Sequence, residues 1–398
     1  MKRVLTKILI YILVIVSMFF FSNDFGLIDI EKTAIITAIA IDLNGDEYEV
    51  SAQIAVPEAN GVNSENQKAT LSSTGKTASE AINGLGNVSG WYPKLSFCNL
   101  IILGNELVKT NVIRVIDYFS KSPRVQDSAI VVVAENTAKE LLDFSSPLDN
   151  ISSFAIQKII LKDPGFDRNI AVTTIKDFCS DYYSENASSF TPFIKTEKTP
   201  SGGNQSGGSS SGGSSDSSDS SSKSGSENKK VLFDATNTAL FLDGKMVGLL
   251  SSEETFTYNL MFSDVNGTSF PLYDADGKNY YLTVMRANAK TDVVADEKSL
   301  TAEFSVDIYC KIMDQNADKS GSTYINNVKL PAAVKEKAEE TIKSLILSLT
   351  EKEKNSGCDF LKIKRNLYRF NYPYYHSYKD NFLSVFETKV SVNVTGQK

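Results

Sequence analysis

The sequence predicts a mixed α+β protein with two or three lobes of mixed sheets covered by helices, preceded by an N-terminal hydrophobic segment that acts as an anchor or a signal. Three observations lead to this prediction. The chain has 398 residues, which at roughly 150 residues per domain gives two or three domains. Strand and helix patterns alternate in its first half, and its second half is rich in β-branched and aromatic runs. A tract without any apolar side chain, residues 199–230, separates the two halves.

The N-terminal residues 1–25 are expected to form a signal or membrane-anchor segment. Lys2, Arg3 and Lys7 accompany an uninterrupted apolar run at residues 8–21, as in the hydrophobic region of an export signal or a short anchor. As a helix this run is ~21 Å long, short of the ~30 Å hydrocarbon core of a bilayer. The basic residues favour the cytoplasmic side and direct the following chain outward. Residues 22–25 offer no small-residue cleavage site, so we expect an uncleaved helix to retain the protein.

Residues 26–198 are predicted to form an N-terminal mixed α/β domain. Asn44-Gly45-Asp46 is a hairpin signal between two apolar or alternating runs. Thr77 with Glu80, and Thr137 with Glu140, have the spacing of capping boxes at helix starts. The predicted strands are 34–43, 47–56, 95–103 and 129–134, and the predicted helices are 77–85, 111–120 and 137–142.

Residues 199–230 are predicted to be a flexible Ser/Gly-rich linker or loop, because nothing in them can be buried to offset their conformational entropy. The sequence leaves open whether this tract joins two domains or is a long loop within one.

Residues 231–398 are predicted to form a C-terminal α+β domain. A long helix is expected at 332–354, with Pro331 before it and Gly357 after it. Its apolar face comprises Val334, Ala338, Ile342, Leu345 and Leu349. The predicted strands are 236–242 and 245–250, turned at Asp243-Gly244, followed by 280–289, 299–313 and 382–394. An antiparallel sheet packed against the long helix is the expected arrangement.

The four cysteines, Cys98, Cys179, Cys310 and Cys358, are widely spaced and form no C-x-x-C pair, which excludes a zinc ribbon. They allow three disulfide pairings, among which the sequence does not choose, or they are small buried apolar residues. The apolar run around Cys98 favours burial for that residue.

Composition and motifs give no support for catalysis, and we predict no catalytic, cofactor-binding or metal-binding residue. The formal net charge is −7 with a pI near 5.1, and no Lys/Arg cluster on one segment suggests nucleic-acid binding. His376 is the single histidine and is expected to be a packed or surface residue.

Three acidic groups were weighed as sites, and each has a structural interpretation. Residues 42–46 and 274–277 resemble fragments of calcium loops but lack the Glu at the twelfth position, so acidic turns between strands are expected. Glu253 and Glu254 are adjacent, and a solvated or helix-capping pair is expected rather than an acid/base pair.

Several stretches together resemble the Ger(x)C family, the C subunits of nutrient germinant receptors of spore-forming bacteria. They are residues 30–42, which follow the export segment and precede a hairpin, residues 95–142 and residues 237–255. The closing order also matches: a long helix, then Cys358-Asp359-Phe360, then a basic-aromatic stretch and a final strand ending at Gly396. The order of these motifs carries the resemblance, which covers the chain outside the Ser/Gly tract.

The resemblance implies a non-enzymatic receptor subunit on the extracytoplasmic face of a membrane, the outer face of the spore inner membrane. Its implied partners are the A-type and B-type receptor subunits, and direct nutrient binding is not expected. The family's lipobox cysteine is absent after the hydrophobic run, so no lipid anchor is carried over. Glu253, Glu254 and Asp359 match family positions, and we assign them structural roles. The alternative functions are an extracytoplasmic solute-binding protein of a transporter and a secreted hydrolase.

Overall fold

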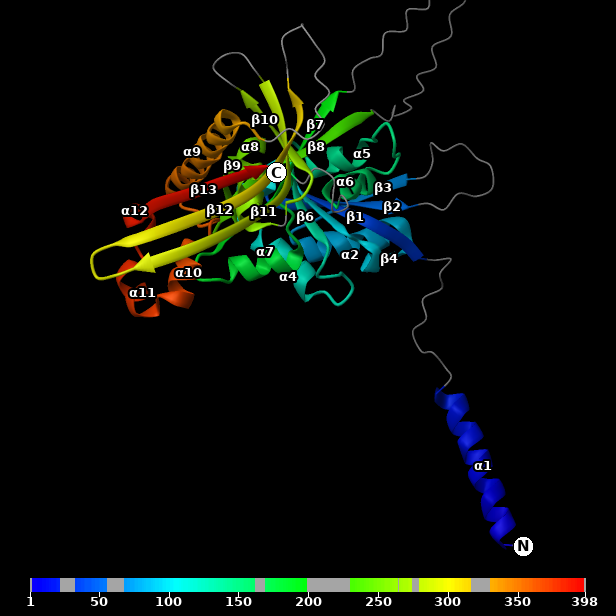
Figure 1. The fold of residues 1–398 in the computed structure, drawn as a ribbon. Helices are drawn as coiled ribbons and strands as arrows, with labels where there is room; N and C mark the ends of the chain where they lie inside the picture. The colour runs from blue at the N-terminus through cyan, green and yellow to red at the C-terminus, as the bar shows by residue number, and fades with distance from the viewer. Residues whose placement is uncertain are drawn as a thin grey trace, which may run out of the picture.

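The computed structural model describes residues 2–21, 33–55, 68–161, 169–198, 230–263, 265–273, 279–315 and 330–396. Within these ranges the chain forms two sheets with helices packed against them (Figure 1). The predicted mixed α+β class is confirmed.

The first helix, α1 (Lys2–Phe21), contains the hydrophobic run of the N-terminus. Its described apolar side chains are exposed, as Leu9 at 64% and Met18 at 70% illustrate. Among the helices that the structure describes, none is long and apolar enough to cross a membrane. Residues 22–25, where we found no cleavage signal, lie outside the described ranges, and the anchor stays a prediction.

The first sheet has the strand order β3-β2-β1-β5-β6-β7-β8-β9, with β4 paired to the start of β1. The strands β1, β5, β6 and β7 run parallel, and antiparallel strands complete the sheet at both ends. The bounds are β1 (Thr33–Asn44), β2 (Glu47–Ala55), β3 (Lys68–Gly75), β4 (Tyr92–Lys94), β5 (Leu100–Leu103), β6 (Ile130–Ala134), β7 (Ser188–Lys198), β8 (Val231–Leu242) and β9 (Lys245–Leu250). All residues of β5 and β6 are buried, as expected for central parallel strands covered on both faces.

Helices cover both faces of this sheet. Successive side chains of β1 point to opposite faces of the sheet, so Ile39 and Ile41 lie in one core and Ala38 and Ala40 lie in the other. The first core is closed by α2 (Ala78–Ser89), α3 (Asn105–Val108), α4 (Ile113–Lys121) and α7 (Ile175–Tyr182), and the second by α5 (Ala138–Asp143) and α6 (Ser152–Ile160). Large residues on one face and alanines on the other let the short helices α5 and α6 approach β1 closely.

The predicted strand 95–103 is wrong in its first part. Leu95–Phe97 form a 3-10 turn, η3, and the strand begins only at Leu100. Pairing to β1 explains the break: Lys94 lies opposite Ile35, and Leu100 lies opposite Ala38. The chain therefore advances six residues while its partner strand advances three, and the 3-10 turn takes up the excess.

The ends of the Ser/Gly tract are fixed by β7 and β8, which pair antiparallel in the first sheet. Lys198 lies directly opposite Val231, so residues 199–229, which lie outside the described ranges, connect neighbouring strands.

Replacing residues 199–229 by a four-residue Gly/Ser turn is expected to raise the free energy of unfolding by no more than ~2 kcal/mol. The loop length is halved three times, and each halving lowers the entropic cost of loop closure by ~0.6 kcal/mol. Denaturant unfolding of both proteins measures the change. A loss of several kcal/mol would contradict it.

The second sheet has the order β10-β11-β12-β13. Its strands are β10 (Thr268–Tyr273), β11 (Asn279–Ala295), β12 (Leu300–Gln315) and β13 (Glu387–Gly396). The long helix α9 (Ala332–Ser356) packs on it, ends at Gly357 in the left-handed conformation with φ 72°, and buries Ile346 rather than Leu345. Helices α8 (Ser252–Phe262), α10 (Ile363–Phe370), α11 (Tyr372–Tyr378) and α12 (Phe382–Val385) complete this half.

Two expectations for the second sheet are wrong. Strand β13 pairs parallel with β12, because the helical connection from α9 to α12 returns the chain to the end of the sheet where β12 began. The predicted strand 382–394 begins only at Glu387, because residues 382–385 form the helical turn α12, which Phe386 caps by donating its N–H to Phe382 O; both phenylalanines are buried.

All four cysteines are free thiols and buried. Cys98 and Cys179 lie in the core of the first sheet, and Cys310 and Cys358 lie in the core of the second. The disulfide pairings that the sequence allowed are therefore absent from this structure. Leu240 and Leu250 of the first sheet belong to the second core, so the two halves share buried apolar side chains.

Candidate functional site

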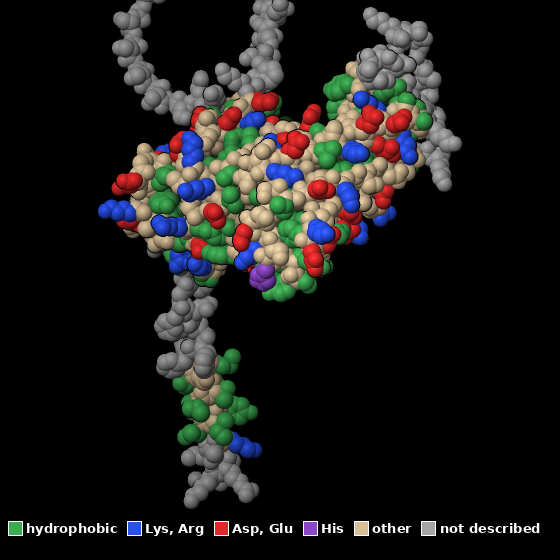
Figure 2. All heavy atoms as spheres, turned by 90° about the vertical axis from the view of Figure 1, so that its left-hand side faces the viewer, with side chains coloured by type: hydrophobic (Ala, Val, Ile, Leu, Met, Phe, Trp, Pro, Cys, Tyr) green, Lys and Arg blue, Asp and Glu red, His purple; other side chains and the backbone are tan. Residues whose placement is uncertain are grey.

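The single histidine lies on the surface. His376 is an exposed residue of α11 and contacts the rings of Tyr372 and Tyr375 edge-on, at centroid distances of 5.7 and 5.6 Å. Figure 2 shows the histidine at the rim of the face that carries the C-terminal helices. The described structure brings no carboxylate or nucleophile within hydrogen-bond distance of it, and the expectation of a packed or surface residue is confirmed.

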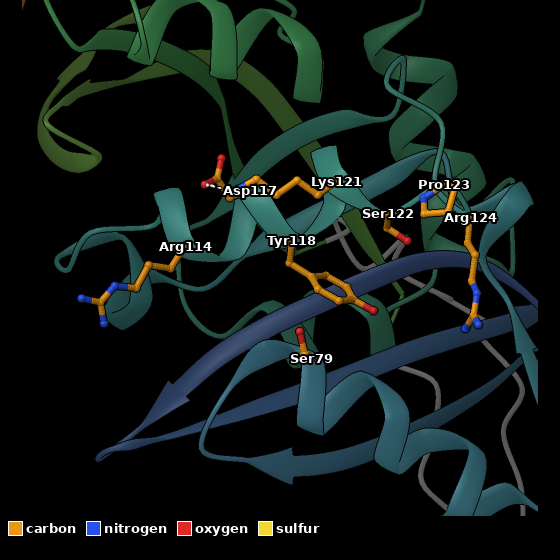
Figure 3. A pocket seen from close by; sticks show the side chains of 8 residues that line it. All are labelled: Ser79, Arg114, Asp117, Tyr118, Lys121, Ser122, Pro123 and Arg124. Carbon is orange, nitrogen blue, oxygen red and sulfur yellow. Dashed lines mark hydrogen bonds and ion pairs between the residues drawn. The ribbon is translucent and has the colours of Figure 1, made fainter.

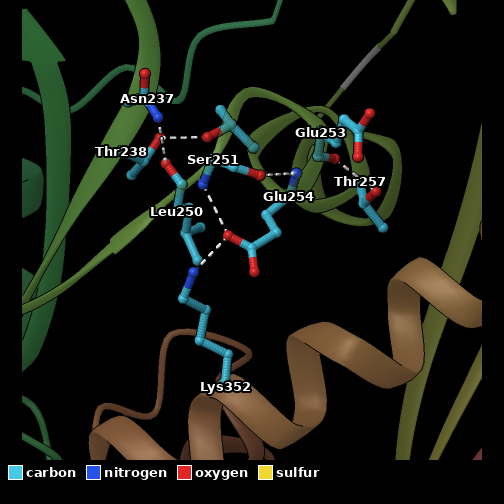
Figure 4. A network of polar contacts seen from close by, with 9 residues as sticks. Asn237, Thr238, Leu250, Ser251, Glu253, Glu254, Thr257 and Lys352 are labelled. Carbon is cyan, nitrogen blue, oxygen red and sulfur yellow. Dashed lines mark hydrogen bonds and ion pairs between the residues drawn. The ribbon is translucent and has the colours of Figure 1, made fainter.

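Glu254 caps α8, as the capping interpretation predicted. The Ser251 hydroxyl accepts from Glu254 N at 3.2 Å, and the Glu254 carboxylate accepts from Ser251 N at 2.7 Å, which is a complete capping box (Figure 4). The same carboxylate forms an ion pair with Lys352 of α9. The Glu253 side chain is exposed, and the Glu253 backbone carbonyl accepts a hydrogen bond from the Thr257 hydroxyl.

The rest of this network joins α8 to the end of the first sheet. Asn237 Nδ2 donates to Leu250 O at 3.0 Å, and the hydroxyls of Thr238 and Thr255 lie 3.0 Å apart in a buried position. The family-like stretch 237–255 is thus held together by polar contacts that fix a strand pair and a helix start. These contacts have a structural role.

Replacing Glu254 by alanine is expected to lower the free energy of unfolding by about 1–2 kcal/mol, since the cap and the ion pair are lost together. Glu253→Ala is the matched control on the same helical turn and should change it by less than about 0.5 kcal/mol. Denaturant unfolding of the two variants measures the difference. Equal losses of unfolding free energy in the two variants would show that the capping carboxylate of Glu254 contributes no more than the exposed carboxylate of Glu253.

Asp42 is not the acidic turn residue that we expected. It lies within β1, is 9% exposed, and its carboxylate accepts from Ala138 N at 2.7 Å and Lys139 N at 2.9 Å, at the start of α5. A Cβ on Gly104 would lie 1.9 Å from Asp42 Oδ1, so the glycine makes room for this cap. Burial raises the pKa of Asp42, and the two N–H donors oppose the rise. The second acidic segment, residues 274–277, lies outside the described ranges.

A buried carboxylate pair lies where the two halves of the chain meet. Glu353 of α9 is 0% exposed and Asp359, after it, is 4% exposed. Asp359 caps α10, accepting from Ile363 N at 2.6 Å and from Lys364 N at 3.1 Å. It also accepts from the Asn186 amide, which comes from the loop before β7. The pair therefore ties the end of α9 to the first sheet.

Burial and mutual repulsion disfavour the ionisation of both carboxyl groups at once. Burial, and then the Asp359 charge, raise the pKa of Glu353 well above its ordinary value. Asp359 is held ionised by two backbone N–H groups and the Asn186 amide, whereas Glu353 accepts only from Leu361 N, and its Oε1 accepts no hydrogen bond from the described residues. The hydrogen bonds therefore favour the negative charge on Asp359 and the proton on Glu353.

Sequence reasoning missed Glu353. The sequence contains a signal for it. Glu353 follows Ile342, Ile346 and Leu349 at spacings of three or four residues, which places it on the buried face of α9. A carboxyl group on an apolar helical face needs a partner, and Asp359 provides it.

The structure also places three cations, Arg114, Lys121 and Arg124, around one hollow. A surface hollow of about 620 Å³ lies between α2 and α4, lined by Ser79, Arg114, Asp117, Tyr118, Lys121, Ser122, Pro123 and Arg124. In Figure 3 the Tyr118 ring points toward Ser79 across the hollow, and Arg114 and Arg124 extend to opposite sides. Asp117 is paired with Lys121 at 3.0 Å and accepts from the Tyr183 hydroxyl. All three cations lie within residues 114–124, a basic segment that the sequence analysis did not single out.

The family of the chain follows from comparison of both halves. The model described as spore germination protein N-terminal domain matches residues 27–196, and the model described as spore germination B3/GerAC like, C-terminal, matches residues 236–397. The chain therefore belongs to the GerAC-like family of spore germination proteins.

Two individual proteins agree with this assignment. The chain is 23% identical over 186 residues to YfkR of Bacillus subtilis (strain 168), a protein named for spore germination, and the match covers 44% of this chain and 46% of YfkR. It thus spans about half the length of that curated relative. The crystal structure of the GerBC protein shares the fold, with a TM-score of 0.52 at 16% identity, covering 92% of this chain and 99% of that one. The resemblance to this family that the sequence indicated is confirmed.

Proposed function

We propose that this chain is a non-enzymatic subunit of a spore nutrient germinant receptor. It acts by protein–protein contact with the A-type and B-type membrane subunits to trigger germination. The observation that carries the proposal is that the two GerAC-like family models match the chain in order, residues 27–196 and then 236–397. The polar clusters support it, because Glu254, Asp42 and Asp359 are each engaged in capping a helix.

The proposed location is the extracytoplasmic face of a membrane, the outer face of the spore inner membrane. The basic residues before the apolar run of α1 support this orientation. Fractionation of spores followed by N-terminal sequencing tests the attachment. We expect the membrane fraction to contain a chain that retains residues 8–21, and a soluble mature form that begins after residue 21 would contradict it.

Deletion of the gene tests the receptor role. Spores are expected to lose the response to one class of nutrient and to keep the response to nutrient-independent triggers. Complementation with His376→Ala or Glu253→Ala should restore the response, because both side chains are exposed and neither supports the fold. The full-length chain should co-purify with the two membrane subunits.

Two results would overturn the proposal. Spores that lack the gene but respond normally to every nutrient would remove the receptor role. Direct nutrient binding by the purified full-length chain, measured by calorimetry, would favour the alternative of an extracytoplasmic solute-binding protein.

A further inference from the structure

Exposed aromatic and basic side chains gather around the end of α2. Val88 is 64% exposed, Trp91 50% and Phe97 52%, and they come from α2, the turn after it, and η3, which are consecutive along the chain. Lys94 Nζ lies 5.8 Å from the Phe97 ring centroid. We call these four residues, together with Arg114, Lys121 and Arg124 of the neighbouring hollow, the aromatic–basic surface.

The patch and the hollow are continuous. The Arg124 guanidinium, which lines the hollow, lies 5.5 Å from the ring centroid of Tyr92, the residue after Trp91. Gln126 Nε2 donates to Ser96 O at 3.2 Å and fixes the loop after α4 to η3. The two parts are therefore one surface on the side of the first sheet that carries α2, α4 and β4 (Figure 1).

The charge of this surface is opposite to that of the chain, which is −7 overall. Asp117 lies among the cations, but Lys121 and the Tyr183 hydroxyl already engage it. Arg114 and Arg124 are exposed and form no ion pair with a carboxylate of the described residues. Exposed Asp127 is the acidic residue nearest in sequence to Arg124. Two arginines beside tryptophan and phenylalanine match the composition of surfaces that bind anionic membranes, where aromatic rings sit at headgroup depth.

The hydrophobic helix α1 connects to the chain at this same surface. Thr33, the first residue of β1, lies opposite Tyr92 of β4. Phe21 and Thr33 are 33 − 21 = 12 residues apart, and at roughly 3.3–3.6 Å per residue this length of chain spans at most about 40 Å. The point where the chain from α1 joins the fold therefore lies beside the aromatic–basic surface, within about 40 Å of α1 along the chain.

We propose that the aromatic–basic surface binds an anionic lipid surface, with the arginines on lipid phosphates and Trp91 and Phe97 at headgroup depth. The inference rests on the membrane location in the proposed function. It adds a second contact, which orients the body of the protein on the membrane and leaves the second sheet free for partner subunits.

Trp91 is the only tryptophan in the chain, so its fluorescence reports on this surface alone. The full-length protein is mixed with vesicles of phosphatidylcholine, or of phosphatidylcholine with phosphatidylglycerol, and vesicle association is measured by flotation. We expect a shift of the emission to shorter wavelength, and quenching by lipids brominated on their acyl chains, with the anionic vesicles. Added salt should reverse both effects, because the attraction is electrostatic.

Substitutions test the contribution of the arginines. Arg114→Gln and Arg124→Gln should each lower the affinity for anionic vesicles about fivefold, the effect expected of one basic residue at a charged membrane surface. Arg286→Gln removes an exposed arginine from β11 in the second sheet and should leave the affinity unchanged.

The outcomes separate this inference from the proposed function. Flotation with an unchanged Trp91 spectrum would mean that the N-terminal segment alone attaches the protein, which overturns the lipid-binding surface and keeps the membrane location. Equal losses of affinity in all three arginine variants would overturn it as well, because the charge effect would then be general. No association with either vesicle would contradict both the surface and the membrane attachment.

Discussion

Replacing Asp359 by alanine is expected to lower the free energy of unfolding by about 3–5 kcal/mol, because it leaves buried polar groups without their partner. The carboxylate accepts from Ile363 N, Lys364 N and the Asn186 amide. Alanine removes all three hydrogen bonds at a position that is 4% exposed. Water has little access there, since the enclosed space beside Asp359 is about 10 Å³, no more than about one water molecule needs.

Glu340→Ala is the matched control, because Glu340 is an exposed carboxylate of α9 whose only ion pair among the described residues, to Lys337, is at 3.8 Å. Its effect should stay within about 0.5 kcal/mol. Denaturant unfolding of the full-length variants gives both values. In spores, Asp359→Ala should reduce germination in proportion to the lost amount of protein, whereas His376→Ala should not. A stable Asp359→Ala protein that fails in germination would instead assign Asp359 a direct functional role.

Local signals explain what was predictable. Thr77 accepts from Glu80 N, and the turn at Asp243-Gly244 lies between β8 and β9. Gly357 ends α9 because its positive φ suits a residue without a side chain. In each case the partners are a few residues apart, so the pattern contains the whole interaction.

Long-range partners explain what was not predictable. Asp42 caps a helix that begins 96 residues later, and the parallel placement of β13 depends on the path of the helices that precede it. The cations of the hollow belong to α4 and the residues just after it, and only folding brings them beside Tyr92 and Trp91. The spacing of residues along the chain contains no information about such encounters.

The raised pKa values of Glu353 and Asp359 make stability depend on pH in a direction opposite to that of an ordinary ion pair. The folded-state pKa of Glu353 is raised well above its ordinary value of ~4.3, and that of Asp359 is raised to about 6. A raised pKa means that the folded state binds the proton more tightly than the unfolded state. The stabilisation is therefore fully present below the unfolded pKa and is lost as the pH rises through the folded pKa. Buried Asp42 and half-buried Asp181, whose pKa values are also raised by desolvation, add in the same direction.

Replacing Glu353 by glutamine is expected to remove the part of this dependence that Glu353 contributes. The amide N–H of glutamine donates to the Asp359 carboxylate as the protonated acid does, and its carbonyl oxygen accepts from Leu361 N, but it has no proton to lose.

The variant should match the wild-type stability near pH 5 and exceed it near pH 8, because only the wild type loses stability as Glu353 ionises. Denaturant unfolding at a series of pH values measures how the free energy of unfolding of each protein changes with pH, and exposed Glu340→Gln on the same helix is the control.

Parallel pH dependence for wild type and Glu353→Gln would show that Glu353 is ionised in the folded protein. In that case the charges of Glu353 and Asp359 would have to be balanced by groups other than a proton on Glu353, and Lys354, Lys362 and Lys364 are the cations in the same stretch of chain. Glu353→Gln conserves the shape and the hydrogen bonding of the side chain. A stability of the variant that increasingly exceeds that of the wild type as the pH rises would therefore identify the proton of Glu353 as the cause.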